Sequence, residues 1–328
     1  MNMIKELYRK VVKFFKFAYT KRRKIEKFLG QMVVYALLIT ISYVFLFPLI
    51  KMITLSFMSR ADIIDPEIDY IPKNPTFSNF SSAMVVLDGW KSLWASIWVS
   101  SVLAVAQTVV SALTGFAFAR YDFRFKRILF VLILVSFIIP VPVMLIPRMM
   151  MVSGTQDWVI QTFGWETFKL FGTITPQFVL SILGQGVNSA ILILIFYNFF
   201  RMIPTVLYEA ARIDGASAFA QFWHITIKIS VSTIIVVFLF SFVWNWNETY
   251  VTGLFNAEFK SLPSQLGVFD NNFRSAAPDS AGGGGSNNIN EAYKMAATLL
   301  SMIPLFIIYF AAQKQFVEGI EKTGITGE

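Results

Sequence analysis

Long apolar runs, almost free of charged residues, alternate with shorter polar segments along this chain. Six of the runs have about 20 residues, the length that a helix needs to cross a hydrocarbon core of about 30 Å. They lie near residues 31–50, 95–118, 128–147, 176–200, 229–250 and 295–313. The pattern predicts an all-α integral membrane protein with six transmembrane helices.

Two of the predicted spans contain residues that interrupt a helix. The third holds Pro140, Pro142 and Pro147, and the fourth holds Gly184 and Gly186. Proline removes a backbone donor and glycine lowers helix propensity, so we expect both spans to be bent or broken. Such breaks are tolerated in a membrane where the freed backbone groups face protein or a water-filled path.

Composition agrees with a membrane protein. Of the 328 residues, 55% are hydrophobic and only 15% are charged. The chain has no Cys and one His, which excludes disulfides and thiol catalysis and leaves little material for a metal centre. We therefore expect no catalytic residues and no metal site in this chain.

The net charge of +8 is concentrated at the amino end. Residues 1–29 carry ten of the 28 Lys and Arg residues, interleaved with apolar residues at roughly helical spacing. This pattern is typical of a basic amphipathic helix on an anionic inner leaflet, so membrane lipid is an expected partner. The alternative is a solvated arm that only fixes orientation. We expect no nucleic-acid partner, because no reading module is recognisable.

The positive-inside rule gives the orientation of the predicted spans. With the amino terminus inside, the inner segments hold 19 of the 28 basic residues. Both termini and the loop 204–228 are then cytoplasmic, and the loop 252–292 lies outside. The outer loop includes the Gly-rich run 282–286, which is either a natural mobile stretch or an engineered spacer.

The loop 204–228 has the order helix, turn, helix. Pro204 suits a first helical turn, the next nine residues favour a helix, Gly215 can end it in the left-handed conformation, and Ser217 can cap the following helix. Small Ala210 and Ala211 let another surface approach the backbone closely. Each residue alone also fits an ordinary amphipathic helix between two spans.

Taken together, residues 208–217 resemble the coupling-loop signature of the membrane subunits of binding-protein-dependent ABC importers, in their carbohydrate branch. The run is Tyr208-Glu209-Ala210-Ala211-Arg212-Ile213-Asp214-Gly215-Ala216-Ser217, flanked by Phe199 to Pro204 and by Phe222-Trp223. The resemblance extends to Ser261-Leu262-Pro263 and to Phe316 to Ile320. Within the family, the chain is similar to the smaller maltose-importer permease subunit. One departure is Lys228, where the family usually has proline, and we expect the exit into the fifth span to be straighter than in relatives.

The resemblance implies a type I ABC importer permease fold with a cytoplasmic coupling helix, over residues 30–328, in a bacterial or archaeal cell membrane. It implies a second permease subunit, two ATPase subunits that bind ATP and Mg²⁺, an external sugar-binding protein and a sugar substrate. No Walker A sequence is present, so no nucleotide cofactor is expected in this chain. The residues implied to contact the ATPase are Glu209, Ala210, Ala211, Arg212, Asp214 and Gly215.

Polar groups within apolar spans are the candidates for the substrate path, because such groups are costly to bury against lipid. They are Gln107, Asn188, Asn198, Trp244, Asn245, Trp246 and Asn247. An aromatic face beside amides suits the C–H patches and hydroxyls of a sugar. The alternative for the tryptophans is an interfacial aromatic belt.

Two other classes of membrane protein make different demands on the sequence. An ion-coupled secondary transporter predicts intramembrane carboxylates or inverted repeats, and neither is evident. A membrane enzyme acting on lipid-linked sugars needs clustered acidic or His residues near the membrane face, and none is found. Both classes remain as alternatives.

Overall fold

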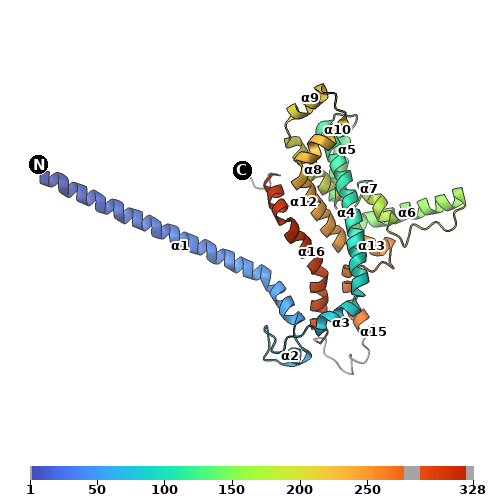
Figure 1. The fold of residues 1–328 in the computed structure, drawn as a ribbon, viewed down its shortest axis with the longest axis horizontal. Helices are drawn as coiled ribbons and strands as arrows, with labels where there is room; N and C mark the ends of the chain where they lie inside the picture. The colour runs from blue at the N-terminus through green and yellow to red at the C-terminus, as the bar shows by residue number, and fades with distance from the viewer. Residues whose placement is uncertain (1, 277–288, 323–328) are drawn as a thin grey trace. The chain divides into compact units, whose positions relative to one another are not determined.

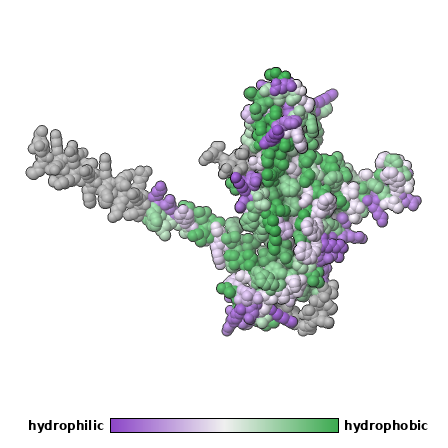
Figure 2. All heavy atoms as spheres, viewed as in Figure 1, coloured by the Kyte–Doolittle hydropathy of each residue, from purple (hydrophilic) through white to green (hydrophobic). Residues whose placement is uncertain are grey.

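The computed structural model describes residues 2–276 and 289–322, and the side chains of residues 27–274 and 291–317. All regular elements in these ranges are helices, which confirms the all-α prediction (Figure 1). The face of the molecule drawn in Figure 2 is largely apolar, as expected for a surface that contacts lipid. Contacts divide the chain into two units, residues 1–76 and 77–328.

The first unit consists of α1 (Asn2–Ser56), α2 (Arg60–Ile64) and the loop that follows. In α1, the stretch Lys27–Ser56 is long and apolar enough to cross a membrane. The helix runs through residue 29 without a break, so the predicted basic helix continues into the first span. The side chains of residues 2–26 lie outside the described residues, and contact with lipid there stays a prediction.

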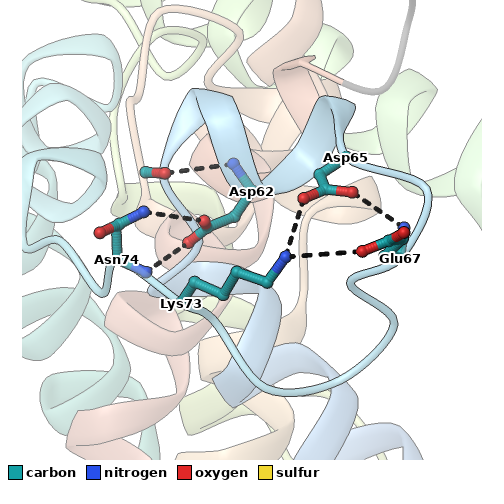
Figure 3. Close-up of polar contacts among 6 residues, drawn as sticks. Asp62, Asp65, Glu67, Lys73 and Asn74 are labelled. Atoms are coloured by element: carbon teal, nitrogen blue, oxygen red, sulfur yellow. Dashed lines mark hydrogen bonds and ion pairs between the residues drawn. The ribbon is translucent and has the colours of Figure 1, made fainter.

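The loop after α1 is fastened by a buried aspartate. Asp62, only 2% exposed, accepts hydrogen bonds from the backbone N–H and the side-chain amide of Asn74, at 3.0 and 3.4 Å (Figure 3). Ser59 caps α2 by accepting from the backbone N–H of Asp62. Burial opposes the ionisation of Asp62, but hydrogen bonds from Asn74 and Ser59 outweigh it and hold its pKa below 3.8.

A second aspartate closes the same loop from its solvent side. Asp65 accepts from the backbone N–H of Glu67 and from Lys73 Nζ, both at 3.0 Å, and Glu67 lies 4.0 Å from the same ammonium (Figure 3). The Glu67 N–H and then Lys73 lower the pKa of Asp65. These exposed ion pairs orient the loop and contribute little stability.

The second unit contains the remaining helices. They are α3 (Ser78–Val86), α4 (Gly89–Arg120), α5 (Lys126–Ile138), α6 (Val141–Phe163), α7 (Thr175–Ile182), α8 (Ser189–Met202), α9 (Thr205–Ile213), α10 (Ala218–Gln221), the π-helix η1 (Phe222–Thr226), α11 (Ile227–Ile229), α12 (Val231–Asn247), α13 (Tyr250–Phe255), α14 (Leu262–Gly267), α15 (Phe269–Ala276) and α16 (Ile289–Lys322).

Six membrane spans are compatible with these helices. Three single helices are long and apolar enough to cross, namely Lys27–Ser56, Gly89–Arg120 and Glu291–Val317, and three bent pairs pass the same test. The pair α5 and α6 bends by 110° at Pro140, and residues 183–188 separate α7 from α8. The predicted breaks in the third and fourth spans are therefore confirmed.

The exit from the loop 204–228 is bent, although residue 228 is lysine and not the proline usual in the family. The chain bends by 84° between α11 and α12, at Ser230. The Ser230 hydroxyl donates to the carbonyl oxygen of Thr226 at 2.6 Å, and Thr226 is the last residue of the π-helix η1. A serine bonded to the preceding turn and a π-bulge both bend helices without proline.

Helix α4 is central to the second unit and packs along α8 and α12 (Figure 1). Gly115 allows the close approach to α8, because a Cβ there would lie 2.7 Å from the Cβ of Phe196. Phe196 and Phe200 stack with ring centroids 5.3 Å apart in the core that these helices share. The Gly-rich run 282–286 lies outside the described residues.

Candidate coupling segment and transport path

Helix α9 lies at one end of α4, opposite α3, and is followed by a tight turn (Figure 1). Gly215 has φ +81°, and its N–H donates to the carbonyl oxygen of Arg212 at 3.0 Å. Ala216 N–H donates to Ala211 at 2.8 Å, which satisfies another carbonyl of the last turn. The left-handed conformation favours glycine strongly, so the turn depends on Gly215.

The next helix begins as the sequence predicts. The Ser217 hydroxyl accepts from the backbone N–H of Ala220 at 3.2 Å and caps α10. The side-chain amide of Gln221 returns to the carbonyl oxygen of Ala216 at 2.9 Å. The predicted helix, turn and helix are confirmed. The side chains of Ser217 and Gln221, which follow the turn, stabilise it by hydrogen bonds.

Most of the side chains predicted to meet an ATPase are exposed. Five of the six are exposed and Ala211 is half-buried; the five are Glu209, Ala210, Arg212, Asp214 and Gly215. The charged ones have no ion-pair partner in the described part of the chain. Apolar Ile213, which is 87% exposed, and the stacked pair Phe219 and Trp223 lie beside them. The segment presents charge and apolar surface together, as protein interfaces do.

One residue fastens α9 to the rest of the unit. Tyr208 is 3% exposed, and its hydroxyl shares a 2.8 Å hydrogen bond with Thr226 Oγ1. Its ring lies 6.2 Å from that of Phe116 on α4. Tyr208 therefore connects α9 to the π-helix and to α4.

Arg120, in the last turn of α4, completes this anchor. Its guanidinium lies 4.3 Å from the ring centre of Tyr208, a cation–π contact. The same group donates to the carbonyl oxygens of Phe200 and Ile203, at the end of α8. Sequence reasoning missed both residues. The only signal was a tyrosine directly before the Glu-Ala-Ala run and a lone arginine ending a span.

A second polar site lies inside the unit, around Gln107 of α4. Its amide nitrogen donates to Val187 O at 3.3 Å and to Ser189 Oγ at 3.4 Å. Its oxygen accepts from the Ser241 hydroxyl and from Asn245 Nδ2, the latter at 2.8 Å. Gln107 is 1% exposed, so both ends of a buried amide are satisfied.

The position of Gln107 depends on a glycine. A Cβ on Gly186 would lie 1.8 Å from the Gln107 amide nitrogen, so only glycine leaves room for the side chain. Gln107 is 13 residues from Arg120, or about 20 Å along the helix at 1.5 Å per residue. The break between α7 and α8 thus brings backbone carbonyls to a buried polar group well inside the predicted span.

A cavity of about 100 Å³ lies beside this cluster, between α5, α6, α7, α8, α12 and α13. Asn188 and Asn245 line it, and Gln107 lies directly behind Asn245. The space is large enough for several water molecules.

The other candidates for the path do not line this cavity. Asn198 is exposed on α8, and Asn247 is exposed and donates to Val243 O at 2.9 Å. Trp244 stacks on Phe240, with ring centroids 5.5 Å apart. Trp246 is 2% exposed and packs in the core against α3, α14 and α16.

Comparisons with known proteins agree with this architecture. The chain is 26% identical to a putative ABC transporter permease protein, ORF2, of Caldicellulosiruptor sp. strain Rt8B.4, over 85% of this chain and 91% of the relative. It is 22% identical to the arabinooligosaccharides transport system permease protein AraQ of Halalkalibacterium halodurans, over 88% and 93%. It is 24% identical to the sn-glycerol-3-phosphate transport system permease protein UgpE of Brucella abortus, over 92% and 99%.

The fold is also similar to a solved structure. The TM-score is 0.67, at 19% identity, over 88% of this chain and 96% of a chain in a bacterial ABC transporter involved in the import of the acidic polysaccharide alginate. The likeness shows the ABC importer permease fold. The family profile described as binding-protein-dependent transport system inner membrane component matches residues 107–322. Because that match covers more than half of the chain, the protein belongs to this family of inner membrane transport components.

Proposed function

We propose that this chain is one of two permease subunits of an ATP-driven sugar importer. A second permease forms the other half of the path, two ATPase subunits bind ATP and Mg²⁺ at the cytoplasmic face, and an external binding protein delivers the sugar. The loop 204–228 and both termini are cytoplasmic. The chain itself is a transport subunit and hydrolyses no nucleotide.

The observation that carries this proposal is the construction of α9. Its charged and apolar side chains are exposed and lack partners in the described chain, while Tyr208 anchors it in the aromatic core. A surface helix that only joined two spans would need no such anchor. A helix that transmits movement needs both a free face and a rigid attachment.

The anchor suggests how movement of α9 reaches the path. Tyr208 contacts Arg120, and Arg120 holds the carbonyls at the end of α8. The opposite end of α8 begins at Ser189, which bonds to Gln107 beside the cavity. A displacement of α9 therefore acts on the pair α4 and α8, which is joined at one end through Arg120 and near the other through Gln107 and Ser189. ATP drives transport if the ATPase binds one arrangement of this pair more tightly than the other.

A sugar substrate is supported by the relatives and by the cavity wall. The relative from Halalkalibacterium halodurans is named for arabino-oligosaccharides, and the structural neighbour is described as importing alginate. The wall includes the side chains of Gln177, Gln185, Asn188 and Asn245. Amides can both donate to and accept from sugar hydroxyls.

The assembled importer tests the proposal. We expect ATP hydrolysis by the reconstituted complex to rise when the binding protein is loaded with its sugar, and uptake to require ATP inside the cell or vesicle. An ion-coupled transporter would instead keep its uptake without an ATPase and lose it when the ion gradient collapses. That second result would refute the proposed function.

A further inference from the structure

A single arginine lines the cavity beside Gln107. Arg148 lies in the second turn of α6 and is half-buried, and its guanidinium donates to the carbonyl oxygen of Gln185 at 3.1 Å. Gln185 belongs to the break between α7 and α8. This one bond holds the arginine against the broken segment and leaves most of its five donors for other partners.

Within the described residues, no carboxylate forms an ion pair with Arg148. The cavity wall contains one acidic side chain, Glu248. Its Oε1 accepts from the backbone N–H of Val251 at 2.6 Å, at the start of α13. The carboxylate of Glu248 is thus engaged by the backbone of α13, where it stabilises the first turn of that helix.

Arg148 lies one residue beyond the predicted third span, 128–147, and is half-buried at the cavity wall. Charged side chains that face a cavity inside a membrane protein pair with one another or mark the path of a substrate or ion. Arg148 has only a neutral carbonyl partner in the described chain, so its charge is not balanced there. Guanidinium groups bind carboxylates, sulfates and phosphates through paired hydrogen bonds.

We propose that Arg148 makes this cavity a subsite for an acidic group on the transported sugar. The inference rests on the proposed function and adds the class of substrate. The amides of Asn188 and Asn245 contact hydroxyls of the same sugar residue, and the guanidinium contacts its carboxylate, sulfate or phosphate.

The same chemistry could be supplied by the phosphate of a lipid headgroup, and the experiment separates the two sources. The complete importer is placed in nanodiscs of phosphatidylcholine, without the binding protein. Galacturonate and galactose are titrated at constant ionic strength, and binding is followed by saturation-transfer NMR. A parallel set uses nanodiscs with phosphatidylglycerol.

We expect galacturonate to bind at least about tenfold more tightly than galactose, as charge-assisted hydrogen bonds allow. Arg148→Gln should remove this preference, and Arg148→Lys should keep part of it. Lys169→Gln, which removes an exposed positive charge beyond the end of α6, should leave it unchanged. The preference should be the same in both lipids.

Three results would overturn the proposal. They are equal or absent binding of the two sugars, a preference that survives Arg148→Gln, and a preference that phosphatidylglycerol abolishes, which would assign the arginine to lipid. Stimulation of ATP hydrolysis by the loaded binding protein is measured on the same complexes. If stimulation persists without an acid preference, only the subsite fails; if no sugar stimulates hydrolysis, the proposed function fails.

Discussion

The candidate coupling segment, residues 204–228, and the Gln107 cluster, which is Gln107 with Val187, Ser189, Ser241 and Asn245, are both polar. They are built in opposite ways. The coupling segment is continuous in sequence, exposed, and attached to the core by Tyr208. The Gln107 cluster gathers residues from α4, α8 and α12 that are 80 to 138 positions apart, and it is buried. The first is suited to meet a partner and move with it. The second holds three helices in one arrangement.

The difference shows where a polar group stabilises and where it communicates. Inside the unit the hydrogen bonds of Gln107 satisfy buried groups, so removing Gln107 leaves several of them without a partner at once. On α9 the charged side chains are exposed to solvent, so their removal should cost little stability. Mutations in the two regions should therefore separate stability from coupling.

The largest expected effect is on coupling. Gly215→Pro fixes φ near −65°, which is incompatible with the observed +81°, and it deletes the N–H that bonds to Arg212. We expect uptake to fall by about a hundredfold or more, since a backbone clash of this type costs about 3 kcal/mol. The amount of folded protein in the membrane should change little. Uptake and basal ATP hydrolysis are measured on the same vesicles.

Gly215→Asn is the matched control for the proline variant. Asparagine tolerates the left-handed conformation better than most residues, and a Cβ at this position would meet nothing within 4 Å. Its uptake should stay within about threefold of the parent, because the remaining strain is of the order of 0.6 kcal/mol. If both variants transport normally, α9 is not the coupling element.

The next effect is on stability. Gln107→Leu leaves the Ser241 hydroxyl, the Asn245 amide and the Val187 carbonyl without their shared partner, and we expect a loss of about 1–3 kcal/mol. Gly186→Ala should have a similar effect, because its methyl group would displace the Gln107 amide. Thermal unfolding in detergent measures both. Asn198→Leu, at an exposed position on α8, should cause no loss.

A smaller effect is expected at the anchor that joins the two regions. Tyr208→Phe removes the hydroxyl bonded to Thr226 and keeps the ring under Arg120, so the expected cost is about 0.5–1.5 kcal/mol. In combination with Thr226→Val the costs should not add, because each change breaks the same bond. Tyr250→Phe, at an exposed tyrosine, serves as the control. Additive losses of stability would show that Tyr208 and Thr226 do not share this hydrogen bond.

The smallest effect concerns the loop that follows α1. The folded pKa of Asp62 lies below 3.8, so its contribution to loop order is present above that pH and is lost as pH falls through the folded value. We expect the Asn74 amide to exchange faster with solvent once the pH falls through the lowered pKa of Asp62, and Asp62→Asn to exchange fast at every pH. Hydrogen exchange followed by mass spectrometry measures this. Unchanged protection in the variant would show that the carboxylate does not fasten the loop.

Local features of the fold could be predicted from sequence. Helix α9, the turn at Gly215 and the cap at Ser217 follow from neighbouring residues, and the break at Pro140 follows from the chemistry of proline. The bend at Ser230 was missed because serine rarely bends a helix unless its hydroxyl bonds to the preceding turn. That bond is visible only in the structure.

The internal site was less predictable, because it depends on long-range contacts. Gln107, Asn188 and Asn245 were found as polar residues in apolar spans, but the same criterion also selected Trp246, which packs in the core. Hydropathy does not tell which face of a helix meets a neighbour. Arg148 was overlooked because the predicted third span ended at residue 147, so the arginine was counted with the outer segments.

The most direct test of the account asks what α9 touches. The chain has no cysteine, so Ala210→Cys provides one unique thiol on the exposed face of α9. In the complete importer, a short bifunctional maleimide–photoreactive reagent should join this thiol to the ATPase subunit, with a yield that changes when ATP is added. A membrane-impermeant maleimide should label it only from the cytoplasmic side. Labelling from outside, or no cross-link to any ATPase in an active complex, would contradict the account.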